Sequence, residues 1–242
     1  MDAFGVEWGS FEVDPEVARR VQVGLDELFR ADGEDEAIDA AHALHELVCY
    51  AAVTVEEETV PAVRALRGML GLPDFRWKQF ALQLLDTIIS VEGVFDSAGP
   101  LKARVRAEVL RAVPLAEKEQ NSASRDVRGA AIVFLGSASE TPAADFQRFR
   151  SAFERESDPV IQADFALAAT ACVWEADRTV EHANAAGWFE EALEHSNPAV
   201  RFRVGQFLAG RGFRWSGGDL DGLVAAAMPV VLERRLFRQE YL

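Results

Sequence analysis

Four residues with metal-binding or acid–base side chains stand close together near the start of the chain: His42, His45, Glu46 and Cys49. They follow an i, i+3, i+4, i+7 spacing, which places all four on one face of a helix. Imidazole and thiolate groups are good zinc ligands, and an open coordination position would hold a water. The spacing matches no compact zinc motif. No metal site or cofactor is therefore predicted, and a metal-dependent enzyme is kept as an alternative.

Acidic residues form a second pattern, and it is uneven along the chain. The whole chain has 40 acidic and 25 basic residues, a net charge of −15, and residues 1–60 contain 16 of the acids and only three of the bases. Such runs occur at solvated helix ends, and they also form patches that attract basic partners. We expect a protein partner, basic in charge, to contact the two densest runs: Glu34, Asp35 and Glu36, and Glu56, Glu57 and Glu58.

Composition excludes several functional classes. The 242 residues contain no run of 18 apolar residues, so no membrane span is predicted. Cys49 and Cys172 are too few for a disulfide framework, which indicates a reducing, cytoplasmic environment. A strongly acidic chain does not follow nucleic-acid phosphates non-specifically. No Gly-x-Ser-x-Gly turn is present and Gly217-Gly218 is an isolated pair, so neither a serine nucleophile nor a phosphate loop is predicted.

The elements that would position these residues are helices. Asp14-Pro15, Thr141-Pro142, Asp158-Pro159 and Asn197-Pro198 each pair a capping residue with a proline, which is typical of helix starts. Apolar residues recur at helical spacing, and no alternating strand pattern is found. We predict about eleven helices at residues 15–30, 35–52, 59–71, 74–91, 100–119, 124–136, 142–155, 159–175, 179–195, 198–210 and 218–236. The glycine-rich stretch 212–218 predicts a loop.

Three helical segments align without gaps: 126–135, 160–169 and 199–208. Their starts are separated by 34 and 39 residues, and a fainter copy begins near Trp77. Each copy follows another helix through a short polar link, so the repeating unit is a helical hairpin. Hairpins of this period bury their apolar faces only by stacking on one another, which favours a solenoid.

On these residues the chain resembles the HEAT-repeat family, and the stretch 41–70 resembles the front end of bacterial HEAT-like proteins of mostly unassigned role. The resemblance implies an all-α, right-handed α-solenoid of stacked antiparallel hairpins. It would be a single domain with acidic N-terminal helices (1–60), repeats (61–210) and a C-terminal loop and capping helix (211–242). It also implies that Arg128 and Arg201 are structural and link adjacent repeats through Asp residues.

One enzyme of the superfamily suggests an alternative. HEAT-like DNA glycosylases use a carboxylate, aromatic residues and a basic concave groove, for which Trp77, Trp174, Trp188 and Asp164 are the available residues. Residues 61–242 have a net charge of only −2 and no concentration of Arg and Lys, whereas phosphate contacts need one. Tryptophan in hairpin helices is also common in cores.

We therefore predict a non-enzymatic, protein-binding solenoid without cofactor or metal. A small acidic solenoid of this kind could be an immunity or inhibitor protein that blocks a basic bacterial toxin such as a nuclease. The alternatives are a HEAT-like enzyme, acting on DNA or metal-dependent, and a passive assembly scaffold.

Overall fold

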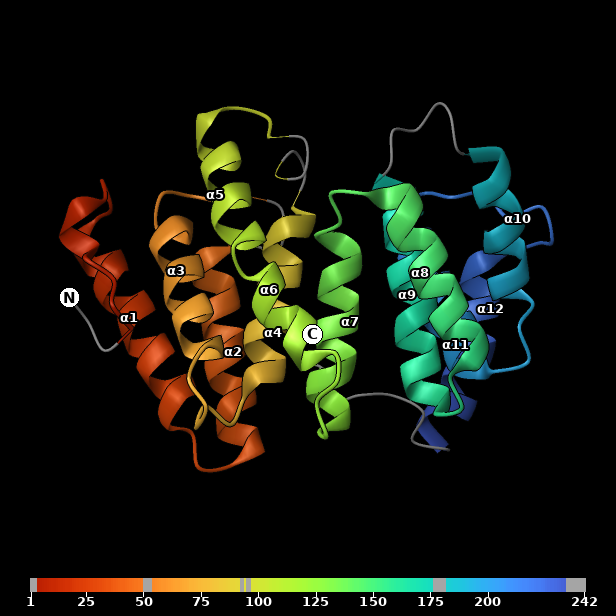
Figure 1. Cartoon of the computed structure of the whole chain (residues 1–242), viewed down its shortest axis with the longest axis horizontal. Coiled ribbons are helices and arrows are strands. Elements are labelled where there is room, and N and C mark those ends of the chain that lie inside the picture. The colour runs from red at the N-terminus through yellow and green to blue at the C-terminus, as the bar shows by residue number, and fades with distance from the viewer. Residues whose placement is uncertain (1–3, 50–53, 92–93, 95–96, 176–181, 234–242) are drawn as a thin grey trace. The chain divides into compact units, whose positions relative to one another are not determined.

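A computed structural model describes residues 4–49, 54–91, 94, 97–175 and 182–233 (Figure 1). Every regular element in these residues is a helix, which confirms the predicted all-α class. Among the same residues, no helix combines the length and the apolar character that a membrane span requires. The chain divides into two compact units, the first ending at Phe134 and the second beginning at Leu135.

The first unit starts with a short 3-10 turn, Trp8–Ser10, followed by helices that account for most of its length. These are α1 (Pro15–Arg30), α2 (Glu34–Val48), α3 (Thr59–Leu70), α4 (Lys78–Ser90), α5 (Pro100–Leu110), α6 (Val113–Glu119) and the greater part of α7 (Arg125–Ser137).

Pairs of helices pack on one another in this unit. Helix α1 contacts α2 and α3 contacts α4, while α1 also contacts α3 and α2 contacts α4 (Figure 1). The buried faces consist mainly of aliphatic side chains, among them Leu25, Leu44 and Leu66, together with Phe80. Burial of each such side chain contributes roughly 1.5–3 kcal/mol, so the apolar stripes of these amphipathic helices drive the packing.

The predicted helix 100–119 is wrong in one respect, because the structure divides it into α5 and α6. Helix α5 ends at Leu110, and Pro114 stands in the first turn of α6. Proline has no N–H to donate to the carbonyl of Leu110 four residues earlier, and its ring clashes with that carbonyl in a continuous helix. The same ring fits the first turn of a new helix without loss.

In its described residues, the second unit contains five complete helices. They are α8 (Pro142–Arg155), α9 (Pro159–Glu175), α10 (His182–Leu193), α11 (Pro198–Ala209) and α12 (Leu220–Glu233). Helix α8 packs on α9 and α10 on α11, while α9 contacts α11 and α11 contacts α12. The predicted loop 212–218 separates α11 from α12, and both Gly212 (φ 69°) and Gly218 (φ 139°) adopt backbone angles that other residues rarely take.

The four predicted cap-proline pairs all stand at helix starts. Asp14, Asp158 and Asn197 accept hydrogen bonds from backbone N–H groups in the first turn of α1, α9 and α11. Thr141 does not cap α8; its hydroxyl lies 3.0 Å from Oδ2 of Asp145 instead.

The aligned segments lie in α7, α9 and α11, and one aligned position has the same role in each. Arg128, Gln162 and Arg201 all donate side-chain hydrogen bonds to backbone carbonyls just before their own helix. The expectation that Arg128 and Arg201 link repeats through Asp residues is therefore wrong. Carbonyls at the end of a helix lack a helical partner, and the nearby guanidinium satisfies them.

Candidate functional site

The predicted acidic residues Glu34, Asp35 and Glu36 form the exposed first turn of α2. Gly33 occupies the cap position without a side chain, and Oε2 of Glu36 reaches back to accept from the backbone N–H of Asp32 at 3.0 Å. Negative charge at this end is stabilised by the helix dipole. This run is therefore held in place by the helix and remains accessible to a partner.

The second acidic run, Glu56, Glu57 and Glu58, lies at the other end of α2. The Thr59 hydroxyl next to it donates to the carbonyl of Val48, the last residue of α2, at 2.7 Å. A helix of 15 residues is about 22 Å long at 1.5 Å per residue. The two runs are thus separated by roughly the length of α2 and do not form one continuous patch.

This second run is also less available for a partner. Glu57 pairs with Arg104 of α5 at 3.1 Å. Burial raises the pKa of Glu58; a backbone hydrogen bond opposes this rise, and the charges of Glu56 and Glu57 add to it. Of the two runs, the one at the start of α2 is the better candidate for a binding surface.

Two hollows lie between α1 and α2, and only the smaller one reaches the first run, at Glu36. The main hollow has a volume of about 620 Å³ and is lined by Arg19, Arg20, Val23, Gly24 and Glu27 of α1 and by Ala43, Glu46 and Leu47 of α2. Gly24 allows the close approach of the two helices, because a Cβ there would lie 2.9 Å from Cδ2 of Leu44. Val23 is 43% exposed, so the hollow has an apolar wall open to solvent.

A second hollow of about 420 Å³ adjoins the first through Glu27, which lines both. Its other lining residues are Arg30, Ala31, Glu36, Asp39 and Ala40. Arg30 lies 3.6 Å from Asp26, so its charge is partly balanced within α1. We call the surface around both hollows the α1–α2 face. It combines an apolar centre at Val23 and Leu47 with a rim of four carboxylates (Glu27, Glu36, Asp39 and Glu46) and three arginines (Arg19, Arg20 and Arg30). Arg19 pairs with Glu16 at 2.6 Å, so the rim keeps an excess of negative charge.

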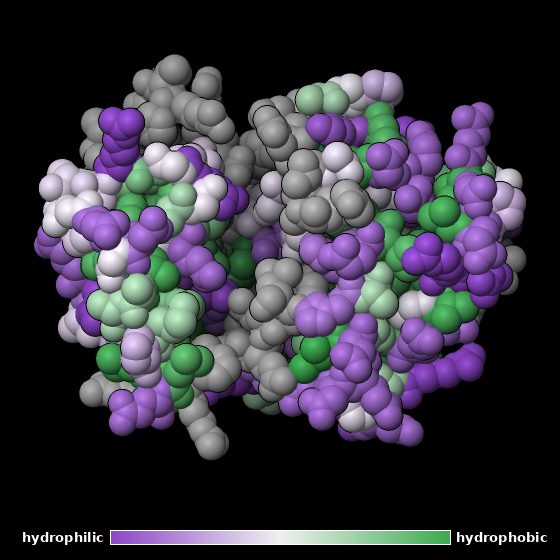
Figure 2. All heavy atoms as spheres, turned by 180° about the vertical axis from the view of Figure 1, so that it is seen from behind, coloured by the Kyte–Doolittle hydropathy of each residue, from purple (hydrophilic) through white to green (hydrophobic). Residues whose placement is uncertain are grey.

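The sequence prediction missed the apolar part of this face. Val23 lies on the polar side of α1, away from the buried stripe of Val21, Leu25 and Leu28. An apolar residue out of phase with its helix is the signal that could have identified it. Figure 2 shows that apolar (green) side chains also lie among hydrophilic (purple) ones on the face of the first unit that it presents.

The four potential metal ligands do not share an accessible face. His42 and Glu46 are exposed, whereas His45 and Cys49 are buried. Cys49 is the cap residue after α2 ends, with φ −151°, so helical spacing no longer applies to it. Burial raises the pKa of the Cys49 thiol to about 11, and Glu46 adds to this rise. Within the residues that the structure describes, no three His, Cys, Asp or Glu side chains are placed to hold a metal ion.

The tryptophans considered for DNA chemistry have structural contacts. Trp77 is buried and donates to the carbonyl of Ala31 at 2.8 Å, and Trp188 is buried and donates to Oγ1 of Thr170 at 3.2 Å. Trp174 packs edge-on against Phe207. The Asp164 carboxylate is buried, and one of its oxygens lies 3.4 Å from Nη2 of Arg203. Trp77 and Trp188 are therefore core residues, as their type favours.

The chain was also compared with known proteins. No family model, curated protein or solved structure matches it.

Proposed function

We propose that this chain is a HEAT-like α-solenoid that binds a basic protein partner through its α1–α2 face. The contacts between neighbouring hairpins support the solenoid. The α1–α2 and α3–α4 pairs stack in the first unit, and the α8–α9 and α10–α11 pairs stack in the second. Each pair covers an apolar face of the next, as repeat proteins require.

The observation that carries the binding function is the composition of the α1–α2 face. Val23 and Leu47 offer a contact surface for an apolar anchor, and the four carboxylates of the rim outnumber its three arginines, two of which pair with Glu16 and Asp26. Binding energy in protein interfaces concentrates in a desolvated apolar centre, while the charged rim speeds association and selects the partner. The matching surface is a helix or loop with an aliphatic or aromatic anchor flanked by Lys or Arg.

The inhibitor role predicted from the sequence is the specific form of this proposal. In it, the basic partner is a toxin such as a nuclease, and occupation of the α1–α2 face blocks its activity in the cytoplasm. A scaffold differs only in leaving the partner's activity unchanged. Adding the purified chain to the purified partner and assaying that activity separates the two roles.

The test is affinity capture from native lysate followed by binding titration of the captured protein. E27K/D39K reverses two carboxylates of the face. The matched control E117K/E194K reverses two exposed carboxylates, one in α6 and one in the link between α10 and α11. Both double variants therefore change the net charge equally. We expect E27K/D39K to weaken binding at least tenfold, or about 1.4 kcal/mol. The control should stay within about twofold of the unmodified chain, because neither of its carboxylates lines the α1–α2 face.

A second pair of variants tests the apolar centre. V23D places a charge on the wall of the main hollow, where Val23 is 43% exposed. L72D is the control: it places the same charge outside the hollow, at a position of the same unit that is 38% exposed. We expect only V23D to abolish capture. Equal effects within either pair of variants would show that the partner, if any, binds elsewhere.

A further inference from the structure

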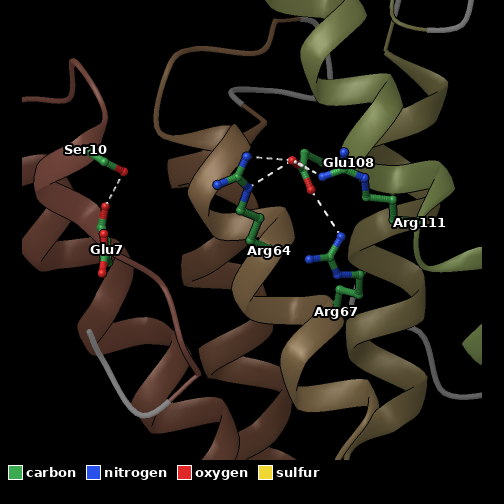
Figure 3. Close-up of polar contacts among 6 residues, drawn as sticks. All are labelled: Glu7, Ser10, Arg64, Arg67, Glu108 and Arg111. Carbon is green, nitrogen blue, oxygen red and sulfur yellow. Dashed lines mark hydrogen bonds and ion pairs between the residues drawn. The ribbon is translucent and has the colours of Figure 1, made fainter.

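A second charged site lies in the first unit, where helices α3 and α5 meet. Helices α3 and α5 pack together, and Glu108 of α5 lies between three guanidinium groups: Arg64 and Arg67 of α3 and Arg111 just after α5 (Figure 3). Oε1 of Glu108 accepts from Nη2 of Arg64 at 2.7 Å and from Nη1 of Arg111 at 2.8 Å. Its Oε2 accepts from Nη1 of Arg67 at 3.1 Å. We call these four residues the Glu108 cluster.

The centre of the cluster is buried, whereas its edge is open. Glu108 is only 5% exposed. The side chains of Arg64, Arg67 and Arg111 are 40%, 29% and 61% exposed. Burial raises the pKa of Glu108, but the hydrogen bond from Arg64 and the charges of all three arginines outweigh it, so the pKa lies below its ordinary value. Glu108 is therefore a carboxylate that holds three cations at the surface.

The cluster carries more positive charge than its structural role needs. One guanidinium balances one carboxylate, and a buried ion pair is satisfied once its hydrogen bonds are complete. Here three arginines surround a single acid, which leaves a local charge of +2. The neighbouring Arg104 does not add to this excess, since it pairs with Glu57 at 3.1 Å.

The arginines also have N–H donors that do not contact Glu108 and that a ligand could use. The contacts to Glu108 use Nε and Nη2 of Arg64 but only Nη1 of Arg67 and Nη1 of Arg111. A guanidinium has five N–H donors in a fixed fork that matches phosphate oxygens. The ring of Phe11 lies 5.1 Å from the Arg64 guanidinium carbon and restricts its motion. The groups are thus positioned before any ligand arrives, which lowers the entropic cost of binding.

We propose that the Glu108 cluster binds the dianion of a phosphate monoester. The ligand's charge of about −2 at neutral pH equals the excess of the cluster, and its oxygens accept from several guanidinium groups at once. Two sources present this chemistry, a small phosphorylated metabolite and a phosphorylated side chain of another protein. The site is separate from the α1–α2 face and does not depend on the function proposed for it.

The experiment is calorimetric titration of the full chain in phosphate-free buffer at pH 7.5. Methyl phosphate is the dianionic probe, and dimethyl phosphate is its monoanionic counterpart. R67Q and R111Q each remove one arginine and leave Glu108 paired with the other two, so the fold is retained. R76Q is the matched control, since it removes an exposed arginine of the same unit that belongs neither to the Glu108 cluster nor to the α1–α2 face.

We expect saturable binding of methyl phosphate and at least about tenfold weaker binding of dimethyl phosphate. R67Q and R111Q should each weaken methyl phosphate binding by about tenfold, as expected for a charge-assisted hydrogen bond, while R76Q leaves it unchanged. No saturable binding, or equal binding by R67Q and R76Q, would overturn the proposal. Once binding is established, tighter binding of a phosphoserine tripeptide or of glycerol phosphate identifies the source.

Discussion

The side-chain amide of Asn197 donates to Oε1 of Gln162 at 2.9 Å and so joins the start of α11 to α9. The same amide nitrogen donates to the carbonyl of Pro159 at 2.8 Å, and the amide oxygen caps α11 by accepting from the N–H of Ala199 at 2.9 Å. Gln162 occupies the repeat position where the other two aligned segments have arginine. The shorter Gln both binds the preceding carbonyls and leaves an oxygen for the next hairpin, which arginine cannot offer.

Asn197→Ala should lower the free energy of unfolding by about 1–2 kcal/mol, because it removes a helix cap and two further hydrogen bonds. Asn197→Asp keeps the capping oxygen but loses both donors, so its loss should be smaller. Urea denaturation of the full chain, followed by circular dichroism, measures both. An Asn197→Asp variant as stable as the unmodified chain would show that the link between α9 and α11 contributes nothing.

Gly136→Ala should destabilise the protein by about 1–3 kcal/mol, the usual cost of overpacking a core. A Cβ at Gly136 would lie 2.5 Å from Cα of Ala168, a backbone atom that cannot move away cheaply. Gly187 is the matched control, because it also lies within a helix and a Cβ there meets nothing within 4 Å. Gly187→Ala should stabilise α10 by up to about 1 kcal/mol. Thermal denaturation of both variants checks that the midpoint falls in Gly136→Ala and rises in Gly187→Ala.

Both thiols should be unreactive in the folded protein at pH 8. Burial raises the pKa of Cys49 to about 11 and that of Cys172 to about 12, and the thiolate is the reactive form. The Cys172 thiol also donates to the carbonyl of Gly136 at 3.4 Å. A thiol-reactive disulfide reagent should label neither residue in buffer and both in denaturant. Rapid labelling of Cys49 alone in buffer would show that the end of α2 opens readily.

The stability of the protein should decrease as the pH falls from 7.5 to 5.5, partly through His45. Burial lowers the pKa of this imidazole, and the charge of Glu46 only partly restores it. The unfolded chain therefore takes up the proton first, and protonation favours unfolding. Burial also lowers the pKa of His195, which acts in the same direction.

His45→Gln should reduce this pH dependence, because it removes the imidazole whose pKa burial lowers. The measurement is the midpoint of thermal unfolding at both pH values for the variant and the unmodified chain. If the change in midpoint between the two pH values were the same in His45→Gln as in the unmodified chain, the imidazole would be protonated as readily in the folded state as in the unfolded chain.

The helices themselves were predictable from the sequence, because the signals for them act over a few residues. A capping side chain such as Asp14 or Asn197 reaches only the N–H groups of the next turn, and an apolar period of 3.6 residues depends only on neighbours in the chain. The division of 100–119 was equally local, since the missing N–H of Pro114 affects only the carbonyl four residues before it. Pro114 thus marks the division in the sequence itself.

The sites depended on packing between helices. Glu108 is 44 residues from Arg64, and only the contact of α5 with α3 brings them together. In the sequence, the acidic residues 34–36 and 56–58 belong to one negatively charged segment. In the structure, the two runs lie at opposite ends of α2, about 22 Å apart. Likewise, spacing placed His42 beside His45 on one helix, but the neighbouring helices bury one and leave the other exposed.

Sequence alone thus determined where the helices begin, which faces are apolar and where charge accumulates, since each follows from hydrogen bonding and periodicity within one segment. Tertiary structure decided which charges meet, which thiols and imidazoles lose water, and where an apolar residue such as Val23 stays exposed. The physical reason is that burial and ion pairing between distant residues are set by the surfaces of two or more helices together, and no single segment contains that information.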